Sequence, residues 1–186
     1  MTTAEQFNEV WEKGDYRRGS TAQRLVPLLR ELIPAGSTIN DYGSGTGRAD
    51  VELLKAGYTV NMVDFADAAL EQEARSLLGE RLTYTIAPLD DLPPWFPVAD
   101  WGICINVLML VDPERLDKML QEMRRTCRNL IVEVYDLPDN RLGRNWTLIA
   151  GDAAFWRDQL SRHWPSVESM PSPEHPRRYI TIARER

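Results

Sequence analysis

Cysteine and histidine, the residues that dominate disulfide frameworks and transition-metal sites, are scarce in this sequence of 186 residues. There are two of each: Cys104 and Cys127 in separate apolar or amphipathic stretches, and His163 and His175 in the last quarter of the chain. None of the four belongs to a CxxC pair or a Cys/His cluster. We therefore expect no disulfide framework, no metal site and a reducing compartment.

Long apolar runs, a hydrophobic leader and a basic excess are also missing. No run approaches the ~20 apolar residues that a membrane-spanning helix needs, and residues 1–10 are polar and acidic, unlike a secretory signal. The net charge is −6, whereas a broad phosphate-binding face usually brings a basic excess. From these absences we expect a cytoplasmic protein without a membrane partner, for which nucleic acid is a disfavoured partner.

What the sequence does contain is an alternation of short apolar runs with helical periods. We expect strands at 38–42, 58–64, 82–86, 101–106, 129–134 and 179–183, and helices at 4–12, between Thr21 and Pro34, and at 48–56, 67–78, 113–126 and 152–163. This order implies crossover connections and a mostly parallel sheet with helices on both faces. In such sheets ligands bind beyond the carboxyl ends of the strands.

A glycine-rich segment, Asp41-Tyr42-Gly43-Ser44-Gly45-Thr46-Gly47, lies between the first of these strands and its helix. Glycines at alternate positions allow a tight turn and leave no Cβ between the backbone and a ligand. The next helix presents free N–H groups and a positive dipole end to that ligand. Asp41, at the strand end, is placed to accept from a ligand amine or to orient the loop.

A second acidic residue, Asp64, ends the following strand, and Phe65 comes directly after it. A carboxylate there is placed to accept from both hydroxyls of a ribose, and an aromatic ring beside it to pack on adenine. A nicotinamide-dependent oxidoreductase would share these features. Its G-x-G-x-x-G fingerprint, counted from Gly43, requires glycine at position 48, where this chain has Arg48.

The pattern D-x-G-x-G-x-G of residues 41–47 resembles the first motif of class I S-adenosylmethionine-dependent methyltransferases, in which the glycines lie under the methionine part of the cofactor. The resemblance covers about residues 38–135. It implies a single-domain Rossmann-like α/β fold with a mostly parallel seven-stranded sheet, S-adenosylmethionine as cofactor and S-adenosylhomocysteine as product. The cofactor-binding residues that we expect are Asp41, Gly43, Ser44, Gly45, Gly47, Asp64, Phe65, Leu89, Asp90 and Asn106, with Tyr16 and Arg17 from the N-terminal segment.

Two positions depart from the family pattern. In many relatives an acidic residue four places before a Leu-Pro pair contacts the adenine amine. Pro88 stands there in this chain, so Asp90 or the backbone near Leu89 must serve. Relatives acting on small molecules often carry His before the valine that matches Val111, and Leu110 removes that familiar base.

The N-terminal segment resembles a lid. Tyr16-Arg17 is similar to an aromatic-basic element of some relatives, in which the arginine would pair with the carboxylate of the cofactor; an ordinary surface arginine is the alternative reading. We accordingly divide the single domain into a helical lid or cap segment, residues 1–36, and a cofactor-binding core, residues 37–186.

Methyl transfer does not require a dedicated catalytic residue. Methyl transfer from a sulfonium needs mainly alignment and the exclusion of water, so we name no catalytic residue. Tyr135, Trp146 and Trp156 are the expected acceptor contacts, and a small or medium-sized molecule is the expected acceptor. The alternatives are an RNA or protein methyltransferase that docks through arginine clusters, and a non-catalytic cofactor-binding partner subunit.

Overall fold

The computed structural model describes residues 4–12, 22–135 and 148–186. The helices are α1 (Ala4–Glu12), α3 (Ala22–Leu32), α4 (Arg48–Lys55), α5 (Gln72–Ser76), α6 (Pro113–Thr126) and α7 (Ala153–Ser161), with short 3-10 turns η1 (Asp67–Ala69) and η2 (Leu108–Leu110). The strands are β1 (Thr38–Tyr42), β2 (Thr59–Asp64), β3 (Leu82–Ile86), β4 (Ala99–Ile105), β5 (Cys127–Tyr135), β6 (Ser166–Pro171) and β7 (Arg178–Arg184). Within the described ranges, no helix has the length and apolar character that crossing a bilayer requires.

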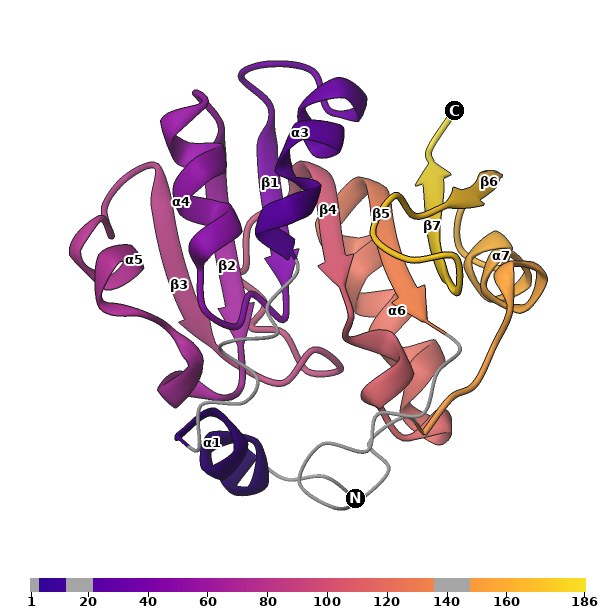
Figure 1. The fold of residues 1–186 in the computed structure, drawn as a ribbon, viewed down its shortest axis with the longest axis horizontal. Helices are drawn as coiled ribbons and strands as arrows, with labels where there is room; N and C mark the ends of the chain where they lie inside the picture. Colours follow the sequence, from indigo (N-terminus) through magenta and orange to yellow (C-terminus); the bar gives the residue numbers. More distant parts are fainter. Residues whose placement is uncertain (1–3, 13–21, 136–147) are drawn as a thin grey trace.

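All seven strands form one sheet in the order β3-β2-β1-β4-β5-β7-β6. The first five are parallel, whereas β7 runs antiparallel to both β5 and β6. The arrowheads of the parallel strands point down in Figure 1, toward α1, so their carboxyl ends share one edge beneath which this helix lies. The expected mostly parallel seven-stranded α/β fold is confirmed.

Each face of the sheet carries its own layer of helices. Alternate side chains of a strand point to opposite faces, so Ile39 and Tyr42 of β1 belong to different apolar clusters. The cluster around Ile39 packs against α3, α4 and α5, and the cluster around Tyr42 packs against α6 and α7. The two layers cover both faces and leave the carboxyl edge for a site.

The structure corrects one expected helix, residues 67–78. It is divided into η1 and α5, with Leu70 and Glu71 in extended conformation between them. The Glu71 N–H donates to the carbonyl of Thr46 in the glycine loop at 3.1 Å, and its carboxylate binds Arg48 through two hydrogen bonds of 2.7 and 2.9 Å. At this point, hydrogen bonds to the glycine loop and to Arg48 replace the hydrogen bonds of a continuous helix. The period of apolar residues along the chain cannot predict such tertiary bonds.

Strand β6 was not among the segments expected from the sequence. The strand follows Pro165 and ends at Pro171, residues that are typical of a loop, and all of its residues are exposed or half-buried. Proline has no backbone N–H to donate. It is tolerated on an edge strand because the outer side of that strand has no neighbouring strand that needs such a donor. Pairing with β7, rather than local preference, forms this strand.

Candidate functional site

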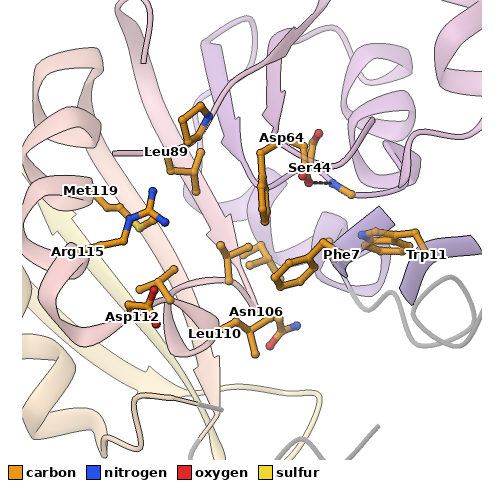
Figure 2. A pocket seen from close by; sticks show the side chains of 18 of the residues that line it. Phe7, Trp11, Ser44, Asp64, Leu89, Asn106, Leu110, Asp112, Arg115 and Met119 are labelled. Carbon is orange, nitrogen blue, oxygen red and sulfur yellow. Dashed lines mark hydrogen bonds between the residues drawn. The ribbon is translucent and has the colours of Figure 1, made fainter. Parts of the chain in front are cut away.

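A pocket opens at the carboxyl edge of the parallel strands. It is lined by the glycine loop, the end of β2, residues 88 and 89, the end of β4 and the connection to α6, the end of β5, the start of β7, and residues of α1, α3 and α6. Figure 2 shows the glycine-loop side, with Ser44 and Asp64, facing the side formed by Leu89, Arg115 and Met119. The pocket lies where a doubly wound sheet binds its ligands.

The glycine loop has the backbone that its sequence requires. Gly43, Gly45 and Gly47 have φ of 82°, 54° and 74°, a region that side chains with a Cβ rarely enter. A Cβ on Gly43 would lie 2.5 Å from Val107 Cγ2. Ser44 lines the pocket, and its buried Oγ has no hydrogen-bond partner among the described residues, which makes this hydroxyl a candidate ligand contact.

Asp64 ties the loop to the end of β2. One carboxylate oxygen accepts from the Gly45 N–H at 2.9 Å and the other from the Ala66 N–H at 2.9 Å. Burial raises the pKa of Asp64, and these backbone donors partly offset the rise. Each carboxylate oxygen has a further lone pair, so the side chain can hold the loop and still accept from a ligand hydroxyl in the pocket.

Below the loop, Asp41 of β1 lies close to Asp50 of α4, and both are buried. Burial raises the pKa of Asp50 to about 7. Burial, and next the charge of Asp50, raise the pKa of Asp41 well above its ordinary value. Neither carboxylate oxygen of Asp50 has a hydrogen-bond partner among the described residues. This acid pair lies under the loop, and neither residue lines the pocket.

Asp90 holds a cation at the far side of the pocket. Its carboxylate accepts from Nε of Arg115 at 2.7 Å and also from Nη2. The hydrogen bonds from Arg115 hold the pKa of Asp90 below its ordinary value, so this is an ion pair at neutral pH. Arg115 lines the pocket, and Asp90 stands behind it.

A buried carboxylate also organises the end of the pocket at β5 and β7. Asn106, with φ of 59°, donates from Nδ2 to Glu133 at 3.0 Å. Glu133 is fully buried, accepts from the hydroxyl of Ser172, and lies 3.4 Å from Nη1 of Arg178. Burial raises the pKa of Glu133, and the bond from Ser172 is the largest opposing effect. The Arg178 guanidinium lies 5.5 Å from the centroid of the Tyr135 ring, close enough for a cation–π contact.

Helix α1 closes the pocket on the glycine-loop side. The Phe7 ring meets the Phe65 ring edge-on, with centroids 5.1 Å apart. Trp11 packs so closely on the loop that a Cβ on Gly45 would lie 3.2 Å from its ring. Both α1 side chains line the pocket, and Figure 2 shows them beside Ser44 and Asp64. The helix thus covers part of the site from outside the sheet.

The expected site residues divide into three groups. Gly43, Ser44, Gly45, Asp64, Phe65, Leu89, Asn106 and Tyr135 line the pocket. Asp41, Gly47, Asp90 and Trp156 lie outside its lining. Tyr16, Arg17 and Trp146 lie outside the described residues.

Two members of the second group have clear structural roles. A Cβ on Gly47 would lie 2.7 Å from the Ala74 Cβ, so this glycine allows α4 and α5 to approach each other. Trp156 is fully buried in the core, where its indole N–H donates to the Gly151 carbonyl at 3.1 Å. The structure therefore does not bring Trp156 to the pocket.

Sequence reasoning expected a cap in residues 1–36 without naming Phe7 or Trp11 as site residues, and it missed the α6 contribution and Arg178. The four-residue spacing of Phe7 and Trp11 places both on one face of a helix, a signal that was available. Arg115 and Met119 share the same spacing on α6. Arg178 had no local signal, because it reaches the pocket only through the antiparallel pairing of Tyr135 with Arg178.

Comparisons with known proteins agree with this geometry. A family model described as a methyltransferase domain matches residues 39–129. A comparison with curated proteins finds no match. Among solved structures, the 1,6-didemethyltoxoflavin-N1-methyltransferase of Burkholderia thailandensis, with bound 1,6-didemethyltoxoflavin and S-adenosylhomocysteine, is 18% identical over 97% of this chain and 86% of its own, with a TM-score of 0.76.

Two further structures share the fold. The magnesium protoporphyrin IX methyltransferase of Synechocystis PCC 6803, with bound S-adenosylmethionine, is 19% identical over 88% of this chain and 78% of its own, with a TM-score of 0.61. A putative methyltransferase in complex with the Trm112 methyltransferase activator of Haloferax volcanii is 14% identical over 96% of this chain and 97% of its own, with a TM-score of 0.72.

The residues that the family model matches include the glycine loop, Asp64 and the segment from Leu89 to Arg115, which together form most of the pocket. The mostly parallel seven-stranded sheet is the one expected from the sequence resemblance, and the pocket lies at the carboxyl ends of its parallel strands, as expected for such a sheet. Residues 39–129 match a methyltransferase domain, in keeping with the sequence resemblance to class I S-adenosylmethionine-dependent methyltransferases, and the solved structures share the fold of this chain.

Proposed function

We propose that the pocket holds S-adenosylmethionine with its methionine part on the glycine loop and its ribose on Asp64, and that the chain methylates a small or medium-sized molecule. The adenine would extend past Phe65 toward Leu89. The acceptor would enter at the end lined by Asn106, Tyr135 and Arg178. All of these residues line the same pocket.

The observation that carries the proposal is the fit of the glycine-loop side to a polar ligand. The Ser44 Oγ is buried at the pocket wall without a partner among the described residues. Gly43 and Gly45 let Val107 and Trp11 pack directly against the loop, and Asp64 offers carboxylate lone pairs to ribose hydroxyls. A polar group over the loop and a diol beside Asp64 would satisfy all of these groups.

When bound, the cofactor supplies an electrophilic methyl group on a sulfonium sulfur. In the transfer, an acceptor N, O or C atom forms the new bond to the methyl carbon while the S–CH3 bond breaks and its electron pair stays on sulfur. Any acceptor proton leaves to solvent or to a base. The contribution of this chain is alignment and the exclusion of water, to which α1 adds by covering the loop.

Neither histidine of the chain lines the pocket. His163, at the end of α7, contacts Asp117 at 3.0 Å, and the ring of His175 accepts from the Arg177 N–H at 3.1 Å. A histidine base of the kind found in some small-molecule relatives is thus absent from the described lining. The proposed function accordingly suits an acceptor whose nucleophile is already deprotonated or carries a free lone pair.

A small acceptor is favoured over RNA by the charges on the surface. Arg124, Arg125 and Arg128, the basic cluster at the end of α6, all have acidic neighbours: Glu185 at 3.1 Å, Glu122 at 2.5 Å and Asp100 at 3.9 Å. With a net charge of −6 for the chain, this cluster offers little unbalanced charge to phosphates. Two of the proteins with a similar fold are by name a 1,6-didemethyltoxoflavin-N1-methyltransferase and a magnesium protoporphyrin IX methyltransferase.

The test is to follow labelled methyl groups. The protein is incubated with methyl-labelled S-adenosylmethionine and, separately, with the small-molecule fraction, the total RNA and the protein fraction of the source cells. We expect enzyme-dependent label in the small-molecule fraction. Label found only in RNA or only in protein would assign the chain to the rival class of acceptor, and S-adenosylmethionine binding without transfer to any fraction would indicate a non-catalytic subunit.

A further inference from the structure

The side of the pocket opposite Asp64 contains Arg115, whose guanidinium donates hydrogen bonds from only one of its edges to the part of the chain that the structure describes. Arg115, in the first turn of α6, binds Asp90 through Nε and Nη2. No hydrogen bond from its Nη1 group is found among the described residues. The Arg115 side chain is 32% exposed, so the guanidinium lies at the pocket wall rather than in open solvent.

Asp90 fixes the direction of this guanidinium. Only 12% of the Asp90 side chain is exposed, and its two oxygens receive the Nε–Nη2 edge of Arg115 in a bidentate contact. A bidentate pair fixes orientation as well as position, because both donors lie in the guanidinium plane. The Nη1 edge is therefore held in one place, beside Leu89 and Met119 (Figure 2).

The position of Arg115 matches one edge of adenine. If the ribose is on Asp64, as the proposed function on which this inference rests requires, the purine extends from Asp64 toward the Leu89 side. The ribose is attached to the five-membered ring of the purine, so the edge of the six-membered ring with N1 and the exocyclic amine lies farthest from it. Arg115 lies across the pocket from Asp64 in Figure 2.

We propose that Arg115, oriented by Asp90, recognises the adenine of the cofactor by donating a hydrogen bond from Nη1 to ring nitrogen N1. A guanidinium is a donor without an acceptor, so it is complementary to the lone pair on N1 and not to the amine. In this arrangement Asp90 is a positioning residue behind Arg115. Pro88, which replaces an acidic residue of many relatives, leaves the adenine edge to this ion pair.

The test uses calorimetric titration with S-adenosylhomocysteine and with its 1-deaza analogue, in which a C–H group replaces N1. We expect the wild-type protein to bind the 1-deaza analogue roughly tenfold more weakly, the effect of one hydrogen bond to a charged group. Arg115→Met keeps much of the apolar stem and should bind S-adenosylhomocysteine roughly tenfold more weakly. It should bind the two ligands alike, because the group that distinguishes them is gone.

Two further variants separate recognition from a structural effect. Asp90→Asn removes the anchor and should reduce the preference for S-adenosylhomocysteine over the analogue. Lys118→Met removes another cation of α6 that acts on Asp90 from outside the pocket lining, and should leave both affinities unchanged. If Arg115→Met fails to fold because Asp90 is left unpaired, the double variant Asp90→Asn/Arg115→Met avoids that unpaired charge and must also lose the preference.

The inference is overturned if Arg115→Met or the double variant keeps the wild-type preference, or if the wild-type protein binds both ligands equally. Either result leaves the proposed function standing, because S-adenosylhomocysteine is still bound. A folded wild-type protein that binds neither ligand would overturn the proposed function and this inference together.

Discussion

Three carboxylates around the pocket hold neighbouring groups in position. Asp64 accepts from the Gly45 and Ala66 N–H groups, Glu133 from Asn106, and Asp90 from Arg115. In each case the carboxylate is buried and its partner lines the pocket or carries the loop that does. At the scale of the residue, buried carboxylates thus hold the pocket-lining groups in fixed orientations.

Asp64 combines this task with the proposed ribose contact. We predict that Asp64→Ala weakens binding of S-adenosylhomocysteine at least tenfold, because it removes the acceptor of the ribose hydroxyls and frees the Gly45 N–H. Calorimetric titration measures the affinity. Asp67→Ala is the matched control, since it removes a half-exposed carboxylate nearby that is paired with Arg75. Equal affinity of a folded Asp64→Ala variant and the wild type would refute the ribose assignment.

The acid pair below the loop predicts a pH dependence of stability. The pKa of Asp50 is about 7 in the folded chain and that of Asp41 is also raised, so the folded state holds these protons more tightly than the unfolded state. Their contribution to stability is therefore complete below about pH 4, the ordinary range of an aspartate, and is lost as the pH rises through about 7.

Asp50→Asn cannot lose that proton. We predict that the free energy of unfolding of Asp50→Asn, relative to that of the wild type, rises between pH 5 and pH 8. The rise reaches about 1.4 kcal/mol per pH unit where unfolding of the wild type releases one proton from Asp50. Urea denaturation at several pH values measures the difference between the two proteins, which cancels most other titrating groups. A difference that stays constant with pH would show that Asp50 does not titrate as described.

Several of the expected site residues that line the pocket follow from local sequence features. Gly43, Ser44 and Gly45 form one loop motif, and Asp64 follows from its place at a strand end. Asp90 was expected near the adenine, but in the structure it lies behind Arg115, which is 25 positions away in sequence and lines the pocket. A sequence pattern shows which residues are near each other along the chain. It does not show which of two residues paired in the fold lines the pocket.

At the scale of the element, the joint between α4 and α5 shows how packing overrides local preference. The expected helix 67–78 is interrupted so that Glu71 can bond to the glycine loop and to Arg48. Gly47 permits the approach, because a Cβ there would lie 2.7 Å from the Ala74 Cβ and 2.8 Å from Leu70 Cδ1. Most other element positions were predictable because the periods of apolar residues are clear, as in α6.

We predict that Gly47→Ala destabilises the protein by about 2–4 kcal/mol, from backbone strain at positive φ together with steric overlap. Gly57→Ala is a matched control. Its φ of 100° is also positive, but a Cβ there meets nothing within 4 Å, so only the strain remains. Urea denaturation should find Gly47→Ala the less stable of the two by about 1–3 kcal/mol. Equal losses of stability in the two variants would contradict this prediction, because they would mean that α4 and α5 move apart without a loss of free energy.

Helix α1 tests the division of the chain into a cap, residues 1–36, and a core. That division stays a prediction: side chains of α1 line the pocket, and so does Ala22 of α3. We predict that Trp11→Ala weakens binding of S-adenosylhomocysteine roughly tenfold, because it uncovers the loop at Gly45. Glu5→Ala, an exposed change on the same helix, should have no effect on calorimetric affinity. An unchanged affinity of Trp11→Ala would remove α1 from the site.

At the scale of the whole molecule, five parallel strands bring residues from distant parts of the sequence to one edge. The glycine loop, Asp64, Leu89, Asn106 and Tyr135 each follow or end a different parallel strand. The alternation of strands and helices was sufficient to predict this meeting point. It was not sufficient to predict Arg178, which comes from a strand that runs the other way.

The central claim is that this edge of the sheet binds the methyl donor. Calorimetric titration of the purified chain with S-adenosylmethionine and S-adenosylhomocysteine, with NAD as the control, tests it most directly. The account predicts dissociation constants in the micromolar range for the first two, about −8 kcal/mol, and no heat of binding for NAD. Binding of NAD in place of the two sulfur compounds, or binding of none of the three by folded protein, would contradict it.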